Sequence, residues 1–216
     1  DERETHYIEW CSAPKYNENS LHAGWVEIFV WKWAKMRYSS VENWSTDTYN
    51  LNTKIAILEN DAFIEWVWWN MWSSVTMLYP CSVLKWDRSS ASHLWVAMAS
   101  EWQNQDVGSK VIHIWKNTTS EIISKSISKS WWISTYRWLV DIKSTATWAV
   151  SKVECDWLIL DDISVSDAIP TINVANSDST IVHEASAWRI NEDFLFYLQS
   201  RWIDSDKAST LIVNWF

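Results

Sequence analysis

The stretch KVIHIWKNTTSEIISKSIS, residues 110–128, decides the fold class of this chain. Apolar and β-branched residues recur at every second position in KVIHIW and again in SEIISKSIS, which is the period of a half-buried β-strand. The polar break KNTTS between them leaves no room for a helix. The stretch therefore predicts two consecutive strands joined by a tight turn.

Runs of the same kind fill the chain from about Gly24 to about Val182. They include VEIFV, KIAILE, SSVTMLYP, YRWLVDI, KVECDWLIL and PTINVAN, with brief polar segments such as KWDRSS and NSDS between them. None of these segments is long enough for a crossover helix, so we expect an all-β region: a sandwich, a barrel or a β-solenoid. Small side chains between the runs favour the stacked coils of a solenoid.

The C-terminal segment RINEDFLFYLQSRWIDSDKASTLIVNWF has a different character and predicts two short helices. Asn191 is a suitable N-cap for the first, which has an acidic first turn, and Asp204 or Ser205 begins the second. The apolar faces of the two helices comprise Phe194, Leu195, Leu198, Ala208, Leu211 and Ile212. We expect a β core at residues 1–188 and a helical segment at residues 189–216.

Composition and charge argue against several classes of function. With 48% apolar and 21% charged residues, the 216-residue chain has the composition of a folded protein. Its net charge of −9 opposes binding to nucleic acid and to anionic membranes. No apolar run approaches the roughly 20 residues of a membrane-spanning helix.

The cysteines and the N-terminus bear on the cellular compartment. Cys11, Cys81 and Cys155 are widely spaced and form no CxxC motif, which argues against a disulfide framework and a zinc knuckle. Charged residues rather than an apolar signal segment follow Asp1, so we expect a fragment boundary there and no secretion. Together these features favour a reducing cytoplasm.

Tryptophan is far more frequent than usual and glycine far rarer. The chain has 21 Trp and 2 Gly, whereas glycine usually makes up about 7% of residues. Trp202 illustrates the anomaly, because it follows the first expected helix at the position where a left-handed residue, usually glycine, ends a helix. We predict a left-handed backbone at Trp202.

Several segments carry a resemblance to a known family. They are HYIEWCSAPKY, YSSVENWSTDTYNLNTK, QNQDVGSKVIHI, HIWKNTTSEIISKSISKSWWISTYRWLVDI, VECDWLIL and IVHEASAWRINEDFLFYLQSRWIDSDKASTLIVNWF. In order, and over essentially the whole chain, they closely resemble the C-terminal core of the SufB/SufD family of iron–sulfur cluster assembly scaffolds. The resemblance implies a right-handed parallel β-helix followed by helices that dock on a SufC-type ATPase. The chain itself has no Gly-rich phosphate loop, so we expect an assembly scaffold rather than an enzyme.

Tryptophan stands at many positions where this family has glycine. The clear cases are Trp10, Trp68, Trp69, Trp115, Trp131, Trp132, Trp138, Trp188, Trp202 and Trp215. Trp44 and Trp66, by contrast, match tryptophans of the family pattern. Turn glycines often have a left-handed backbone or close neighbours, so an indole there should cost roughly 1–3 kcal/mol. We therefore hypothesise that most of these tryptophan letters misreport or replace glycine.

The resemblance implies a cluster site near the end of the β region. Cys155, in VECDWLIL, matches the SufB-type cysteine that holds the nascent cluster, and a thiolate suits iron–sulfur species. His183 and Glu184, in IVHEA, match a His–Glu pair near that cysteine at a dimer interface. Adjacent strand residues point to opposite faces, so only one of the pair faces a given cluster, and Glu184 is our first choice. A packed cysteine with a surface His and Glu is the alternative.

The resemblance also implies a sulfur acceptor. Cys11, in HYIEWCSAPKY, matches the SufB-type cysteine that takes sulfur as a persulfide from a donor protein, which requires partial exposure and a lowered thiol pKa. Cys81 matches no such role, and we expect it to pack. His22, His93 and His113 lack ligand spacing, so we expect structural roles for them.

The two helices offer the partner surface. The resemblance assigns Phe194, Leu195, Leu198, Leu211 and Ile212 to docking of the SufC-type ATPase, a helix-in-groove contact. Internal packing of these residues is the other interpretation.

Three functions remain open. The first is a scaffold that receives sulfur and iron and builds a transient cluster at the interface of a SufB/SufD-type homodimer or heterodimer. DDISVSDAIPTINV, after Cys155, lacks the second cysteine and the His-Thr of bacterial SufB, so a SufD-like structural subunit without a cluster is the second. A β-helical carbohydrate-active enzyme is the third, although no paired-carboxylate site is evident.

Overall fold

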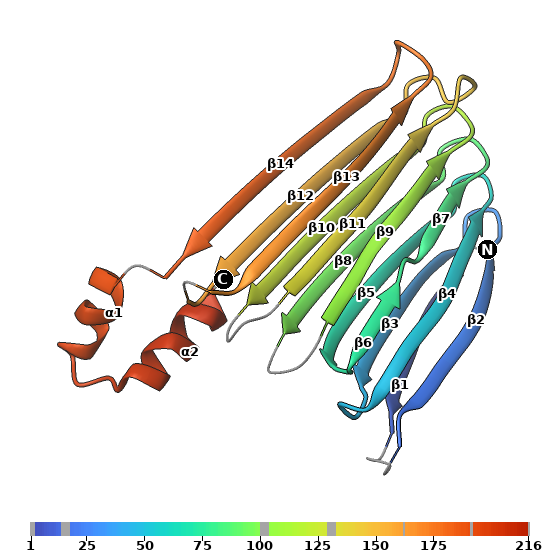
Figure 1. The fold of residues 1–216 in the computed structure, drawn as a ribbon. Coiled ribbons are helices and arrows are strands. Elements are labelled where there is room, and N and C mark those ends of the chain that lie inside the picture. The colour runs from blue at the N-terminus through green and yellow to red at the C-terminus, as the bar shows by residue number, and fades with distance from the viewer. Residues whose placement is uncertain are drawn as a thin grey trace.

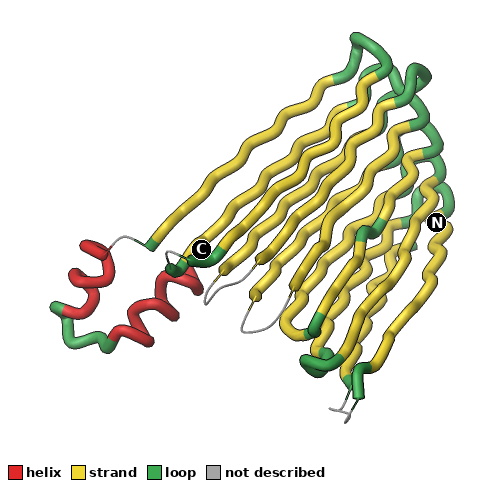
Figure 2. Tube along the Cα trace, viewed as in Figure 1, coloured by secondary structure: helices red, strands yellow, loops and turns green. Residues whose placement is uncertain are grey.

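The computed structural model describes residues 3–13, 18–99, 104–128, 133–161, 163–190 and 192–215. They form a parallel β-solenoid of about six turns followed by two short helices (Figures 1 and 2). The predicted fold class is therefore confirmed. Asn191, the expected cap of the first helix, lies outside the described residues.

Two parallel sheets form the walls of the solenoid. Sheet A contains, in spatial order, β1 (Glu4–Ser12), β3 (Lys35–Asn43), β5 (Phe63–Trp72), β8 (Ser90–Ala99), β10 (Thr119–Ser128), β12 (Val150–Ile159) and β14 (Thr180–Arg189). Sheet B contains β13 (Val165–Val174), β11 (Ile133–Ile142), β9 (Asn104–His113), β6 (Val75–Leu78), β4 (Thr48–Leu58) and β2 (Ser20–Val30), with β7 (Cys81–Leu84) also pairing with β4 and β9. Apart from β6 and β7, which both lie in sheet B, consecutive strands alternate between the sheets, so the period-two runs stack as coils instead of pairing as hairpins.

The strands stack in register, so inward-facing side chains form columns along the solenoid. One column of sheet A comprises Glu9, Ser40, Trp68, Trp95, Ser124, Cys155 and Ala185. Cys11 begins the next inward column, opposite Glu42. Cys11 and Cys155 therefore face the same interior from opposite ends of sheet A. Five inter-strand steps separate β1 from β12, or roughly 24 Å at about 4.8 Å per step.

One corner of successive coils carries left-handed residues. Trp33, Asp61, Arg88, Asn117 and Trp148 have φ between 53° and 63° and are spaced by 27 to 31 residues. The N–H of each of the first four donates to a backbone carbonyl at the same corner of the following coil, so these residues form a ladder along the edge. Asn and Asp tolerate this conformation, whereas it strains a bulky side chain.

Trp202 has φ of 65°, which confirms the predicted left-handed backbone, and its side chain is 98% exposed. Trp33 and Trp148 are further left-handed tryptophans that the sequence did not reveal. Neither Gly24 nor Gly108 has a positive φ. Tryptophan thus occupies backbone sites that ordinarily favour glycine.

The other tryptophans at family glycine positions fall into two groups. Trp68 and Trp138 are buried, and neither indole N–H has a hydrogen-bond partner. The side chains exposed to solvent are those of Trp10, Trp69, Trp115 and Trp188. Trp131, Trp132 and the side chain of Trp215 lie outside the described part of the chain.

Gly108 lies where the backbones of β9 and β11 meet. A Cβ atom at this position would be 1.6 Å from the carbonyl oxygen of Arg137, so no side chain fits. At Gly24, by contrast, the nearest atom to such a Cβ would be the side-chain oxygen of Asn52, at 2.7 Å.

The chain ends in α1 (Glu192–Gln199) and α2 (Ser205–Trp215). Asp204 caps α2, because its carboxylate accepts a hydrogen bond of 2.9 Å from the backbone N–H of Lys207. This matches the predicted start of the second helix. Neither of the two described helices has the length and apolarity that crossing a membrane requires.

Candidate functional site

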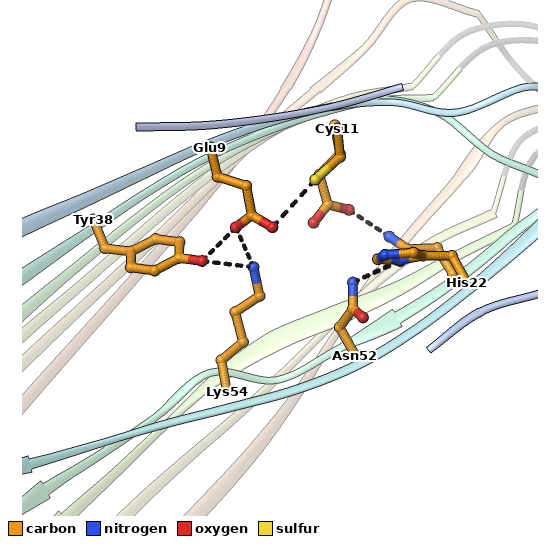
Figure 3. A network of polar contacts seen from close by, with 8 residues as sticks. Glu9, Cys11, His22, Tyr38, Asn52 and Lys54 are labelled. Carbon is orange, nitrogen blue, oxygen red and sulfur yellow. Dashed lines mark hydrogen bonds and ion pairs between the residues drawn. The ribbon is translucent and has the colours of Figure 1, made fainter. Parts of the chain in front are cut away.

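Cys11 lies at the N-terminal end of the solenoid within a network of polar side chains (Figure 3). Its thiol donates a hydrogen bond of 3.1 Å to Oε1 of Glu9, on the same face of β1. Oε2 of Glu9 accepts from Nζ of Lys54 at 2.5 Å and from the hydroxyl of Tyr38, and Lys54 Nζ lies 3.1 Å from that hydroxyl. Three strands, β1, β3 and β4, thus contribute to one cluster around a half-buried thiol.

Lys54 is an unusual interior residue, since its side chain is only 2% exposed. A buried ammonium needs compensating partners. Glu9 provides the negative charge, and the rings of Tyr38 and Trp68 lie 4.9 Å and 4.6 Å from Nζ. The carboxylate of Glu9 is therefore held firmly in place beside the Cys11 thiol.

The electrostatics of this cluster oppose ionisation of Cys11. Burial, the hydrogen bond to Glu9 and the charge of Glu9 together raise the pKa of the Cys11 thiol to about 12. Burial also acts to raise the pKa of Glu9, but the hydrogen bonds from Lys54 and Tyr38 outweigh it, so that pKa is lowered. Sequence reasoning expected a lowered thiol pKa. The structure instead has a protonated thiol beside a carboxylate, because the nearest group is an anion.

A second set of polar side chains continues inward from Cys11. Nδ1 of His22 lies 3.0 Å from Oδ1 of Asn50, which also accepts from Asn52 at 2.7 Å. Asn50 in turn donates to Glu42, whose pKa is raised by burial. The expected structural role of His22 agrees with these contacts. One feature of the sequence could have indicated this network. In YNLNTKIAIL, the polar residues Asn50, Asn52 and Lys54 occupy successive inward-facing positions of β4.

Cys155 lies at the other end of the solenoid, on the inward face of β12. It is fully buried within the apolar core. Burial raises the pKa of its thiol to about 12, with smaller contributions from Asp156 and Glu154. This burial is what the alternative interpretation, a packing cysteine, requires. The thiol nevertheless lies only one strand from the end of sheet A, because β14 is the last strand.

The structure separates the two members of the His–Glu pair. His183 pairs with the buried Val153, so it shares the interior face with Cys155, and its ring contacts Trp138 at 4.9 Å between centroids. Glu184 pairs with Glu154 on the outer face. Both side chains are exposed. His183, rather than Glu184, is therefore the member of the pair on the same face as Cys155.

Within the described residues, no three His, Cys, Asp or Glu side chains lie close enough together to hold a metal ion. Cys155 and His183 could supply at most part of a ligand set from one chain. The remaining cysteine, Cys81, is partly buried on the outer face of β7, and burial raises its thiol pKa to about 11. Its surroundings agree with the expected packing role.

The buried histidines contact small polar residues, although Nδ1 of His93 is buried without a hydrogen-bond partner. Nε2 of His93 lies 2.9 Å from Oγ of Ser82, and the two ring nitrogens of His113 contact Thr118 and Ser120. Burial lowers the pKa of His93 to about 3 and that of His113 to about 4, so both are neutral at pH 7. These contacts fit the structural roles expected for both.

The C-terminal helices lie past the C-terminal end of β14 (Figure 1). A pocket of about 680 Å³ separates them from the strands. Four of the predicted docking residues line it, namely Phe194, Leu198, Leu211 and Ile212. The strand side includes Leu158 and Trp188 as well as Asp156 and Arg189. The apolar faces of α1 and α2 thus border an open groove instead of a closed core.

Comparison with known proteins shows the family to which the chain belongs. A family model described as "SUF system FeS cluster assembly, SufBD core domain" matches residues 1–216. The chain belongs to the SufBD core family. It is 43% identical over 216 residues to "Iron-sulfur cluster assembly protein SufB" of Bacillus subtilis. It is 44% identical over 211 residues to an "Iron-sulfur cluster assembly SufBD family protein" of Staphylococcus aureus. The predicted resemblance is confirmed.

The match covers only part of these SufBD relatives. The whole chain aligns to 46% of the B. subtilis protein, and 98% of it aligns to 45% of the S. aureus protein. A Mycobacterium leprae relative, 41% identical, is covered over 24% of its length. The chain thus spans less than half the length of these relatives.

Proposed function

We propose that this SufBD chain is one half of a scaffold on which an iron–sulfur cluster is assembled. Cys11 would accept sulfur, and Cys155 with His183 would hold the nascent cluster, which is the cargo of the scaffold. The observation that carries the proposal is the position of Cys155, one strand from the open end of the solenoid and on the same face as the exposed His183. The chain itself would have no catalytic turnover.

The open end supports a second chain as the missing part of the site. Ile172 and Val174, on β13, are 45% and 48% exposed, whereas Val140 and Ile142, their partners one coil earlier, are fully buried. β13 and β14 each pair with only one described strand, so each has a free edge that can accept another strand. A second SufB/SufD-type subunit placed here would cover this apolar surface and could add cluster ligands.

Sulfur acceptance at Cys11 has a simple chemical balance. The thiol gives up its proton and its sulfur bonds to the outer sulfur of the donor's persulfide. The bond between the two donor sulfurs breaks, and the donor cysteine leaves as a thiolate that takes up a proton. No external oxidant or reductant is consumed in this exchange.

The raised pKa of Cys155 sets a requirement for cluster binding. Iron–sulfur species bind thiolates, so the proton of Cys155 must leave when metal arrives. Its burial means that β14 or the adjoining end of the solenoid must also move. Docking of a SufC-type ATPase on α1 and α2, next to the pocket against β14, would couple a partner's motion to this end.

A SufD-like structural subunit is the second candidate function. The complete burial of Cys155 favours it, because a packing cysteine would need no access to iron or sulfide. In that case the chain would complete the interface without carrying the cluster.

Anaerobic reconstitution with ferrous iron and sulfide separates the two functions. The scaffold predicts bound iron and sulfide with cluster absorption in the wild-type chain and in Cys81→Ser, and a loss of both in Cys155→Ser. Cys81 is the matched control because it is a partly buried strand cysteine for which no cluster role is proposed. Equal cluster content in Cys155→Ser would contradict the assignment of Cys155, and no cluster in any variant would favour the structural subunit.

A further inference from the structure

In the N-terminal network the Cys11 thiol donates a hydrogen bond to Glu9, a carboxylate that also accepts from Lys54 and Tyr38. We propose that Glu9 is a positioning residue for sulfur acceptance: it holds the Cys11 thiol protonated and directed into the solenoid until a sulfur donor arrives. This inference rests on the proposed role of Cys11 and assigns a role to a residue that the sequence did not single out.

The geometry supports a fixed rather than an incidental contact. The thiol donates to Oε1 of Glu9 at 3.1 Å, while Oε2 is occupied by Lys54 and Tyr38. The side chain of Lys54 is nearly fully buried, so Glu9 cannot turn away without leaving an ammonium unpaired. Of the hydrogen bonds that Glu9 accepts, only the one from Cys11 is made to Oε1.

The charges around the thiol come from three strands. The titratable groups that face Cys11 and Glu9 are Tyr7 on β1, Tyr38 and Glu42 on β3, and Lys54 on β4. Glu9 and Glu42 both disfavour a thiolate, and Lys54 favours one but is already paired with Glu9. Of these groups, only Glu9 is hydrogen-bonded to the Cys11 thiol, so Glu9 contributes most to holding the thiol in place.

Restraint is a better description than general-base catalysis. The pKa of Glu9 is lowered and that of Cys11 is raised to about 12, so transfer of the thiol proton to Glu9 is strongly uphill. A protonated thiol is a poor nucleophile, which protects Cys11 from oxidants and alkylating agents. Contact with the donor would have to displace Glu9 or shield its charge before sulfur is accepted.

The pH dependence of Cys11 alkylation by iodoacetamide tests this role. Peptide mass mapping gives separate rates for Cys11 and for Cys81, an internal reference far from Glu9 in the sequence. In the wild-type chain we expect the Cys11 rate to rise about tenfold per pH unit between pH 6 and 9. Glu9→Gln should raise the alkylation rate of Cys11 at pH 7.5 by about three- to tenfold, because removing the negative charge increases the fraction of thiolate. The lower nucleophilicity of that thiolate offsets part of the increase. Glu27→Gln, an exposed glutamate on β2, is the matched control and should match wild type.

Three results would overturn the proposal. They are an unchanged Cys11 rate in Glu9→Gln, an equal rise at Cys81 that signals general loosening, and a wild-type rate independent of pH, which would make Glu9 a base. If Glu9→Gln folds poorly, Glu9→Gln with Lys54→Met removes both charges and should also accelerate Cys11. Sulfur acceptance is scored separately, as persulfide mass on Cys11 after incubation with a low-molecular-weight persulfide, so failure of the proposed function is distinguishable.

Discussion

Replacing Trp202 with glycine should stabilise the C-terminal helix pair by about 1 kcal/mol. Trp202 has φ of 65° between α1 and α2, and a left-handed backbone costs a residue with a Cβ about 1–2 kcal/mol. Its side chain is 98% exposed, so removing the indole sacrifices almost no buried apolar area. The greater freedom of glycine in the unfolded chain offsets about 0.4–1 kcal/mol of the gain.

Amide hydrogen exchange in α1 and α2 measures this effect locally, because a solenoid need not unfold in one step. We expect the helix amides to exchange about fivefold more slowly in Trp202→Gly. Trp202→Ala is the matched control, since it removes the indole but keeps the Cβ, and it should leave exchange unchanged. Equal protection in the alanine variant, or none in the glycine variant, would refute the argument from backbone strain.

Three further predictions concern the core. Gly108→Ala should cost about 3 kcal/mol or more and lower the urea midpoint, because its Cβ would overlap a backbone carbonyl; Gly24→Ala, which meets only a movable side chain, should be far milder, and equal effects would contradict this. In the native chain Cys155 should not react with a maleimide because it is fully buried, whereas the half-buried Cys11 should react slowly, and both should react fully in urea; native labelling of Cys155 would show that it is accessible. Burial lowers the pKa of His93 from 6.5 to about 3 in the folded chain, so between these pH values His93 binds a proton only in the unfolded chain. Its contribution to the free energy of unfolding should therefore be fully present above pH 6.5 and should fall by about 2 kcal/mol at pH 5. His93→Gln should remove this part of the acid dependence in urea titrations, and an unaltered dependence would contradict it.

The sequence predicted those features that depend on neighbouring residues. Alternation in KVIHIW and SEIISKSIS indicated strands, and Asp204 and Trp202 marked the start of one helix and the end of another. Features that depend on the stacking of coils were missed. Lys54 meets Glu9 across 45 residues, and the left-handed corners at Trp33 and Trp148 become recognisable only when successive coils are aligned.

The orientation of the candidate site residues was equally beyond the sequence. Period-two alternation shows that His183 and Glu184 face opposite ways, but only the register with Val153 shows that His183 faces inward. In the same way, VECDWLIL could not reveal that Cys155 is fully buried in the strand next to β14. The raised thiol pKa of Cys11 follows from burial and from Glu9, two residues away, whose side chain shares its face and meets Lys54 from another coil.

In the proposed scaffold, a cluster forms where two solenoid ends meet, with Cys155 as a ligand. Native mass spectrometry of the anaerobically reconstituted chain tests this most directly, because it reports subunit number and bound iron and sulfide in one spectrum. We expect cluster mass to be carried by a dimer and to be lost in Cys155→Ser. A cluster carried by a monomer, or retained by a dimer of Cys155→Ser, would contradict it.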